Sequence, residues 1–231
     1  SAPWSEVLSN PHFRNAVLIG CLTQFFAIIT GISFLVRYGG TLFTSLGVHG
    51  LTSSLVPSLA FFFGNALGSF FLVDRVGRRS LLVWGMLGMA ATMLAAGATA
   101  LAASTQLGED GEEHVAPGAG YAIVALVVGN MFSFGVSWGF GAWLYISEIM
   151  PLRVRGKAVG LCTGVNWGPA NVASAFISPL MIASPAGPGG TLLFYGCLSL
   201  LVMPFALTCL PETRGRTLEE ITPLFRFEGC G

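Results

Sequence analysis

Charge is scarce in this sequence. Only 10% of its 231 residues are charged, with 11 lysines and arginines against 11 aspartates and glutamates. A soluble globular domain carries roughly 25% charged residues, so these few cannot cover a water-soluble particle of this size. We therefore expect lipid to be the solvent for much of the chain. The net charge of zero removes any electrostatic argument for a nucleic-acid partner.

The patterns of a metal or catalytic site are also lacking. The histidines His12, His49 and His114 lie far apart, and no Ser/His/Asp order, phosphate loop or pair of carboxylates in a soluble pocket is present. The cysteines form no CxxC pair and no metal-ligand spacing, and four of them lie in apolar runs, where cysteine packs as a small residue. They are Cys21, Cys162, Cys197, Cys209 and Cys230. We expect no enzyme activity, metal or cofactor.

Long uncharged runs are what the sequence has instead. A helix that crosses a bilayer needs about 20 apolar residues, and the runs supply six such stretches once the turn signal Ser184-Pro-Ala-Gly-Pro-Gly-Gly190 divides the last run. The expected spans lie near 15–37, 51–73, 80–103, 119–147, 158–183 and 191–210. We predict an all-α bundle over 14–210, with segments 1–13 and 211–231 outside the membrane. The first residues show neither a signal peptide nor an initiator methionine, which favours a fragment or a processed chain.

The basic residues predict how the bundle is oriented. If the six spans alternate, almost all of the arginines fall on one side, and the acidic loop Glu109-Asp-Gly-Glu-Glu113 falls on the other. Only Arg37 breaks this pattern. Because basic residues concentrate on the cytoplasmic side, both termini are expected there, in a multi-pass protein of the plasma membrane.

Small residues four positions apart predict close helix packing. The pairs are Gly64/Gly68, Gly135/Gly139, Gly156/Gly160 and Gly160/Gly164. Such spacings let two helix backbones approach within a bilayer, and together they favour a bundle over isolated anchors.

Three motifs resemble those of the sugar porters, a branch of the major facilitator superfamily, and they occur in that family's order. Leu72-Val-Asp-Arg-Val-Gly-Arg-Arg79 resembles the D-R-x-G-R-R signature between helices 8 and 9. Tyr145-Ile-Ser-Glu-Ile-Met-Pro-Leu-Arg-Val-Arg-Gly156 resembles the segment that closes helix 10. Pro211-Glu-Thr-Arg-Gly-Arg-Thr-Leu-Glu-Glu220 resembles the P-E-T-K-G-R-T-L-E-E signature after helix 12. The resemblance implies helices 7–12 of a twelve-helix porter, most similar to the fungal hexose type.

The motifs imply a gating network at the cytoplasmic face. Carboxylates there can form bidentate, charge-assisted bonds with arginines, and such pairs can latch helix ends in one transporter state and release them in the other. The expected members are Asp74, Arg75, Arg78, Arg79, Glu148, Arg153, Arg155 and Glu212. The bland interpretation is that these residues only set topology and cap helices.

The resemblance also implies a sugar site near the middle of the bilayer, between two six-helix halves. The expected substrate-binding residues are Ser33, Trp143, Asn166, Trp167 and Asn171, and Arg37 and Tyr38 stand at the position of the family's outer gate. Ala27 and Ile28 stand where the family has two glutamines, and Phe140 and Ala142 stand where prolines break helix 10. Gln24 either compensates partly for the lost amides or bonds a neighbouring helix.

Transport of a sugar or sugar-like solute by alternating access is the expected function, whether passive or proton-coupled. Besides the bilayer and the solute, the expected partner is a missing N-terminal six-helix half or a second copy. Arg37 either reaches to the membrane interface or faces the outer vestibule, where it would favour a sugar acid or an acidic polyol. An inactive transporter fragment and a membrane sensor are two further hypotheses, although the chain stops about 20 residues after the last span, short of a sensor's long tail.

Overall fold

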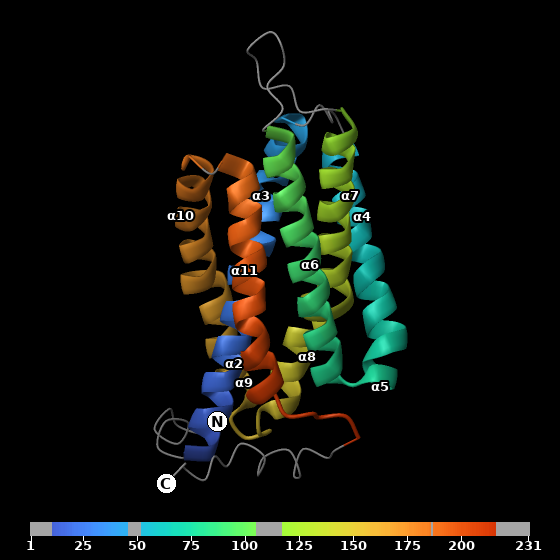
Figure 1. Cartoon of the computed structure of the whole chain (residues 1–231). Helices are drawn as coiled ribbons and strands as arrows, with labels where there is room; N and C mark the ends of the chain where they lie inside the picture. Colours follow the sequence, from blue (N-terminus) through green and yellow to red (C-terminus); the bar gives the residue numbers. More distant parts are fainter. Residues whose placement is uncertain (1–10, 46–51, 105–116, 186, 216–231) are drawn as a thin grey trace.

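The computed structural model describes residues 11–45, 52–104, 117–185 and 187–215, which contain helices and no strand, and confirms the expected all-α bundle. The helices run along one direction as a bundle of rods (Figure 1). Their bounds are α2 Pro11–Ile29, α3 Ile32–Ser45, α4 Thr52–Leu67, η1 Gly68–Leu72, α5 Val73–Val76, α6 Arg78–Ser104, α7 Pro117–Phe134, η2 Gly135–Gly139, α8 Phe140–Ile149, α9 Arg155–Val165, η3 Asn166–Ala170, α10 Asn171–Ile182 and α11 Gly187–Thr208.

These pieces form six rods, which in chain order are α2–α3, α4–η1–α5, α6, α7–η2–α8, α9–η3–α10 and α11. Five of them, among the described residues, are long and apolar enough to cross a membrane, at 13–40, 55–76, 78–103, 118–149 and 187–208. The remaining one, the fifth along the chain, is the continuous helix α9–η3–α10, which has a less apolar composition because polar residues such as Asn166 and Asn171 lie near its middle. A polar centre in a membrane helix needs a partner or a water-filled cavity, so this helix is the first place to look for a site.

The first rod bends between α2 and α3. Gly31 adopts φ 106°, a backbone conformation that favours glycine, and a Cβ there would lie only 2.8 Å from Cγ of Tyr195. The Ser199 hydroxyl donates to the carbonyl oxygen of Thr30 at 3.5 Å. The bend therefore packs against Tyr195 and Ser199 of α11, and α3 continues from it in a direction different from that of α2.

Three rods contain a π-helical turn, η1, η2 and η3, instead of a break. A π-turn adds a residue to the helix while neighbouring backbone groups stay bonded, and such turns are frequent at functional sites. In the second rod no proline marks it, whereas η3 of the fifth rod contains Pro169, which has no amide hydrogen for a helix bond. In the fourth rod, η2 lies just before Phe140 and Ala142, the positions at which prolines would break the helix.

Glycines bring α4 and α7 into backbone contact. A Cβ added to Gly64 would lie 2.6 Å from the carbonyl oxygen of Phe132, and one added to Gly135 would lie 2.5 Å from that of Phe61. The expected Gly64/Gly68 spacing is thus a true packing surface. The pairs of Gly156, Gly160 and Gly164 are different, because a Cβ at any of these three would meet nothing within 4 Å in the described structure.

Replacing Gly135 with alanine should therefore destabilise the bundle. The added methyl overlaps the Phe61 carbonyl, and overpacking of this kind costs about 1–3 kcal/mol. Gly118→Ala on the same rod is the matched control, because a Cβ there meets nothing within 4 Å. Thermal unfolding of the detergent-solubilised protein should show a lower midpoint for Gly135→Ala alone; equal midpoints for both variants would contradict the packing.

Candidate functional site

A cavity of about 330 Å³ opens between α2, α3, α4, the fourth rod and the polar middle of the fifth rod, with a few polar side chains in a largely apolar wall. The two π-turns contribute directly, since η2 supplies Trp138 and Gly139, and η3 supplies Asn166 and Trp167. All five residues expected to bind substrate line it, and so does Arg37. The full lining is Ala27, Ile28, Ile32, Ser33, Val36, Arg37, Phe61, Phe134, Trp138, Gly139, Trp143, Asn166, Trp167 and Asn171. We call it the sugar cavity, after the ligand that the sequence motifs lead us to expect there.

A chain of hydrogen bonds joins the polar side chains of this cavity. Asn171 Oδ1 accepts from Ser33 Oγ at 3.0 Å and from Arg37 Nη2 at 3.1 Å. Asn171 Nδ2 donates to the backbone oxygen of Asn166 at 2.9 Å. Asn166 Nδ2 in turn donates to Gln24 Oε1 at 2.8 Å. Ser33 and Arg37 lie one turn apart on α3 and so share one face, from which both reach across to the start of α10.

Gln24 therefore bonds the neighbouring helix rather than replacing the lost amides. It is fully buried, it is absent from the cavity lining, and its Nε2 has no hydrogen-bond partner among the described residues. Ala27 and Ile28 do line the cavity, at the positions where the family has glutamines. The wall formed by α2 and α3 thus offers a ligand fewer amide groups than the family pattern would.

Three tryptophans line the cavity, and they differ in how far their side chains are exposed. Trp138 is buried, and its indole N–H donates to the Leu82 carbonyl oxygen at 2.8 Å, so its role is to hold η2 against α6. Trp143 is 37% exposed and Trp167 is 71% exposed. Indole faces bind the apolar faces of planar or ring-shaped ligands, so Trp143 and Trp167 are available for stacking.

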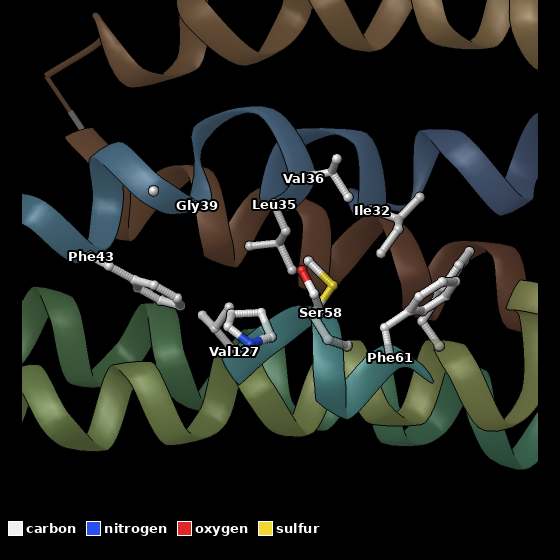
Figure 2. A pocket seen from close by; sticks show the side chains of 12 residues that line it. Ile32, Leu35, Val36, Gly39, Phe43, Ser58, Phe61 and Val127 are labelled. Atoms are coloured by element: carbon white, nitrogen blue, oxygen red, sulfur yellow. The ribbon is translucent and has the colours of Figure 1, made fainter. Parts of the chain in front are cut away.

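An apolar crevice of about 360 Å³ adjoins the sugar cavity between α3, α4 and α7. The two hollows share Ile32, Val36, Phe61 and Phe134. Figure 2 shows that the crevice wall is made mainly of hydrocarbon side chains, among them Leu35, with the hydroxyl of Ser58 as its polar group. It cannot satisfy the many hydroxyls of a sugar, which leaves the sugar cavity as the polar site.

Tyr38 lies away from the sugar cavity. It lines a different hollow, with Leu42, Pro179 and Ile182, and its ring stacks on Phe34 with centroids 6.0 Å apart. The structure therefore does not bring Arg37 and Tyr38 together at one opening, and their assignment to an outer gate stays a prediction.

The three sequence motifs meet near the end of the bundle where α2 begins and α11 finishes (Figure 1). We call it the charged end. Arg78 is its centre: Nε and Nη2 lie 3.1 and 3.0 Å from Glu148 Oε1, and Nη1 lies 3.2 Å from Asp74 Oδ1. The side chain of Glu148 is 21% exposed and that of Asp74 is 81% exposed, so the Glu148 pair is the better shielded from water.

Glu212 binds backbone groups rather than an arginine side chain. Its carboxylate accepts from the N–H groups of Arg78 at 2.9 Å and Arg79 at 3.2 Å, which begin α6. It also accepts from the N–H groups of Thr213 and Arg214, both at 3.1 Å. A carboxylate at a helix N-terminus satisfies amides that have no partner in the helix and complements the helix dipole. Glu212 thereby fastens the segment after α11 to the start of α6.

The remaining expected members of the network are connected differently. Arg79 donates to the Leu207 carbonyl oxygen, and Arg155 Nε donates to the Met150 carbonyl oxygen at 3.2 Å. Arg75 takes part through its backbone oxygen, which accepts from Arg214 at 2.6 Å, and Arg153 is exposed. Side-chain ion pairs thus join Asp74, Arg78 and Glu148. The hydrogen bonds described for Arg75, Arg79 and Arg155 each involve a backbone group.

Sequence reasoning missed Thr213. Its hydroxyl donates to Glu148 Oε2 at 2.6 Å, so Glu148 binds Arg78 with one oxygen and the segment after α11 with the other. The signal was present, because Thr213 directly follows Glu212 in the third motif. The pairing across 65 residues, however, could not be read from that position.

Gly77 is required by this cluster in two ways, and its replacement by alanine should loosen it. Gly77 adopts φ 93°, and a Cβ there would lie 2.8 Å from Glu212 Oε2. Gly215 has a similar φ of 70° but nothing within 4 Å of its Cβ position. We expect Gly77→Ala to lower the thermal midpoint clearly more than Gly215→Ala, since only the first variant adds a clash to the strain of about 1–2 kcal/mol. Equal losses would show that the Glu212 contact contributes nothing.

Comparison with known proteins agrees with the motifs and the fold. The family model "Sugar (and other) transporter" matches residues 1–225. The hexose transporter HXT9 of Saccharomyces cerevisiae is 31% identical over 97% of this chain and 39% of its own length. The sugar transporter ERD6-like 8 of Arabidopsis thaliana is 35% identical over 89% of this chain and 42% of its own.

The fold is similar to that of a solved transporter as well. The inward open conformation of the xylose transporter XylE from E. coli matches with a TM-score of 0.74 and 27% identity, over 91% of this chain and 42% of that one. The chain thus spans about two-fifths of the length of the relatives it matches. The expected resemblance is confirmed: this multi-pass membrane chain belongs to the sugar (and other) transporter family, with half of a major facilitator fold.

Proposed function

We propose that the chain is the half of a sugar transporter that supplies one wall of the substrate site, working by alternating access. The observation that carries the proposal is the sugar cavity, which brings Ser33, Trp143, Asn166, Trp167 and Asn171 together from three rods. One cavity wall is what alternating access needs from one half, because two halves rock around a shared central site. The other wall would come from an N-terminal six-helix half or from a second copy.

The charged end is proposed as the cytoplasmic gate, with both termini on the cytoplasmic side of the plasma membrane. Basic residues concentrate there, as on the cytoplasmic side of other membrane proteins. The pairs of Arg78 with Glu148 and Asp74, and the cap that Glu212 makes on α6, join the second, third, fourth and sixth rods. Charge pairs and caps of this kind have two discrete states, bonded or open, which suits a gate.

The relatives support a sugar as the solute. Several that match most of this chain are described as hexose, glucose or sugar transporters, one is described only as a major facilitator-type transporter, and solved structures of a xylose transporter match as well. The exposed indoles of Trp143 and Trp167 offer apolar faces on which a sugar ring can stack.

Truncating Trp143 should weaken sugar binding. Loss of a stacking indole costs about 0.5–1.5 kcal/mol, so the KM for labelled hexose uptake should rise about two- to tenfold. Trp84→Ala is the matched control, because Trp84 is 66% exposed on α6 and does not line the cavity. Uptake is measured in cells that express the protein containing this chain and lack their own hexose carriers. No uptake by the wild type would refute the proposed function, and equal KM values for both variants would remove Trp143 from the site.

Removing the charge of Glu148 should disturb the gate rather than the site. Glu148→Gln keeps the shape of the side chain but weakens its charge-assisted bond to Arg78, worth about 1.5–3 kcal/mol. Asp74→Asn is the control on the same arginine, since an exposed pair contributes about 0–1 kcal/mol. We expect Glu148→Gln to change the maximal uptake rate and the accessibility of a cysteine reporter in the sugar cavity, with a nearly constant KM. Wild-type rates and accessibility in Glu148→Gln would assign Glu148 to topology alone, and an equally large change in Asp74→Asn would show that shielding from water does not separate the two pairs.

A further inference from the structure

The sugar cavity has an unbalanced set of polar groups. Its lining, drawn from the described residues, includes the cation Arg37 and the indoles Trp143 and Trp167, but neither an aspartate nor a glutamate. The carboxylates of Asp74 and Glu148 pair with Arg78 at the charged end instead. Thus no carboxylate of the described cavity lining neutralises Arg37.

Asn171 positions this arginine, and its side-chain oxygen is fully used. A carbonyl oxygen has two lone pairs, and those of Asn171 Oδ1 are taken by Ser33 Oγ at 3.0 Å and Arg37 Nη2 at 3.1 Å. Asn171 Nδ2 is directed to the Asn166 backbone oxygen. Asn171 therefore has little capacity left for a ligand hydroxyl. Its contribution is to tie the guanidinium of α3 to the beginning of α10.

Most of the guanidinium stays available after this bond. Arginine carries five N–H donors in a planar fork, and Arg37 is an exposed residue that gives one of its Nη2 donors to Asn171. The fork matches the two oxygens of a carboxylate, which it binds with two parallel hydrogen bonds. A cation within the depth of a membrane is costly unless it is paired or faces a water-filled cavity, so an anionic ligand would be favoured here.

Charge decides between two anions that suit an arginine. A phosphate monoester carries about −1.5 to −2 charges at neutral pH, whereas a carboxylate carries a single negative charge. The described cavity lining contains one cation, so a carboxylate would be balanced there, whereas the further charge of a phosphate would have no partner in this wall.

We propose that the solute is a sugar acid, with its carboxylate on Arg37 and its carbon skeleton against the exposed indoles of Trp143 and Trp167. The proposal rests on the proposed transport function and names the class of sugar that the site selects. Arg37 is then a specificity-determining residue. A neutral hexose would leave the guanidinium without its ion pair, and so would bind less tightly.

Ligand binding to the purified protein that contains this chain, in lipid nanodiscs, tests the proposal. The readout is quenching of tryptophan fluorescence, and the three probes are D-glucuronate, D-glucose and D-glucose 6-phosphate. For the wild type we expect a Kd for glucuronate about tenfold below that for glucose, the size of a charge-assisted bond. Arg37→Gln should abolish this ratio, and Arg37→Lys, which keeps the charge but loses the fork, should restore only part of it.

Arg14→Gln is the matched control, because Arg14 is exposed near the start of α2 and lies outside the cavity; it should keep the wild-type ratio. Wild-type binding of glucose as tight as that of glucuronate overturns the proposal, as does an unchanged ratio in Arg37→Gln. Preference for glucose 6-phosphate overturns the carboxylate assignment. Each of these results leaves sugar transport intact, whereas failure of every probe, together with absent hexose uptake, sinks the proposed function too. If Arg37→Gln does not fold, the wild-type ratio decides.

Discussion

In a bilayer, a backbone amide or carbonyl that leaves its helix finds no water to bond, and its isolation costs several kcal/mol. This constraint shapes the whole structure. Where the rods depart from regular helix in the described residues, they use π-turns at η1, η2 and η3 and a glycine bend at Gly31. The Ser199 hydroxyl of α11 lies 3.5 Å from the Thr30 carbonyl oxygen at that bend and 2.9 Å from the Tyr195 carbonyl oxygen of its own helix.

The same constraint explains the composition of the sugar cavity. Polar side chains in the middle of a membrane helix require partners, and here the partners lie on other helices. Asn166 is held by Gln24 of α2, and Asn171 by Ser33 and Arg37 of α3. These bonds join the first and fifth rods, so that the groups which shape the site also fasten its walls. Few amide groups then remain to bind a ligand, so in our proposal the ligand is bound mainly by Arg37 and the exposed indoles.

At the charged end an exposed ion pair stabilises the structure less, because water competes for the hydrogen bonds of both partners. The exposed Asp74 contributes little to the network, whereas Glu148 and Glu212 are tied to groups on several rods. Glu212 depends on Gly77, whose missing side chain leaves room for the carboxylate. One small residue and one carboxylate, 135 positions apart in the chain, thus define how the sixth rod meets the third.

Much of the architecture follows from the sequence alone. Uncharged runs of about 20 residues dictate helices in lipid, and the three motifs identify the family and the Arg78–Glu148 pairing region. The bond of Gln24 to a neighbouring helix was one of two interpretations that the sequence left open, and none of the π-turns was predicted from it. Nor could it separate the packed Gly64/Gly68 spacing from the open Gly160/Gly164 spacing, since both are the same pattern.

Periodicity and charge determined which segments are helices and which ends carry arginines, because these depend on local composition and the solvent. The tertiary structure decided which polar groups meet, because hydrogen bonds act over about 3 Å and depend on how rods far apart in sequence are rotated against one another.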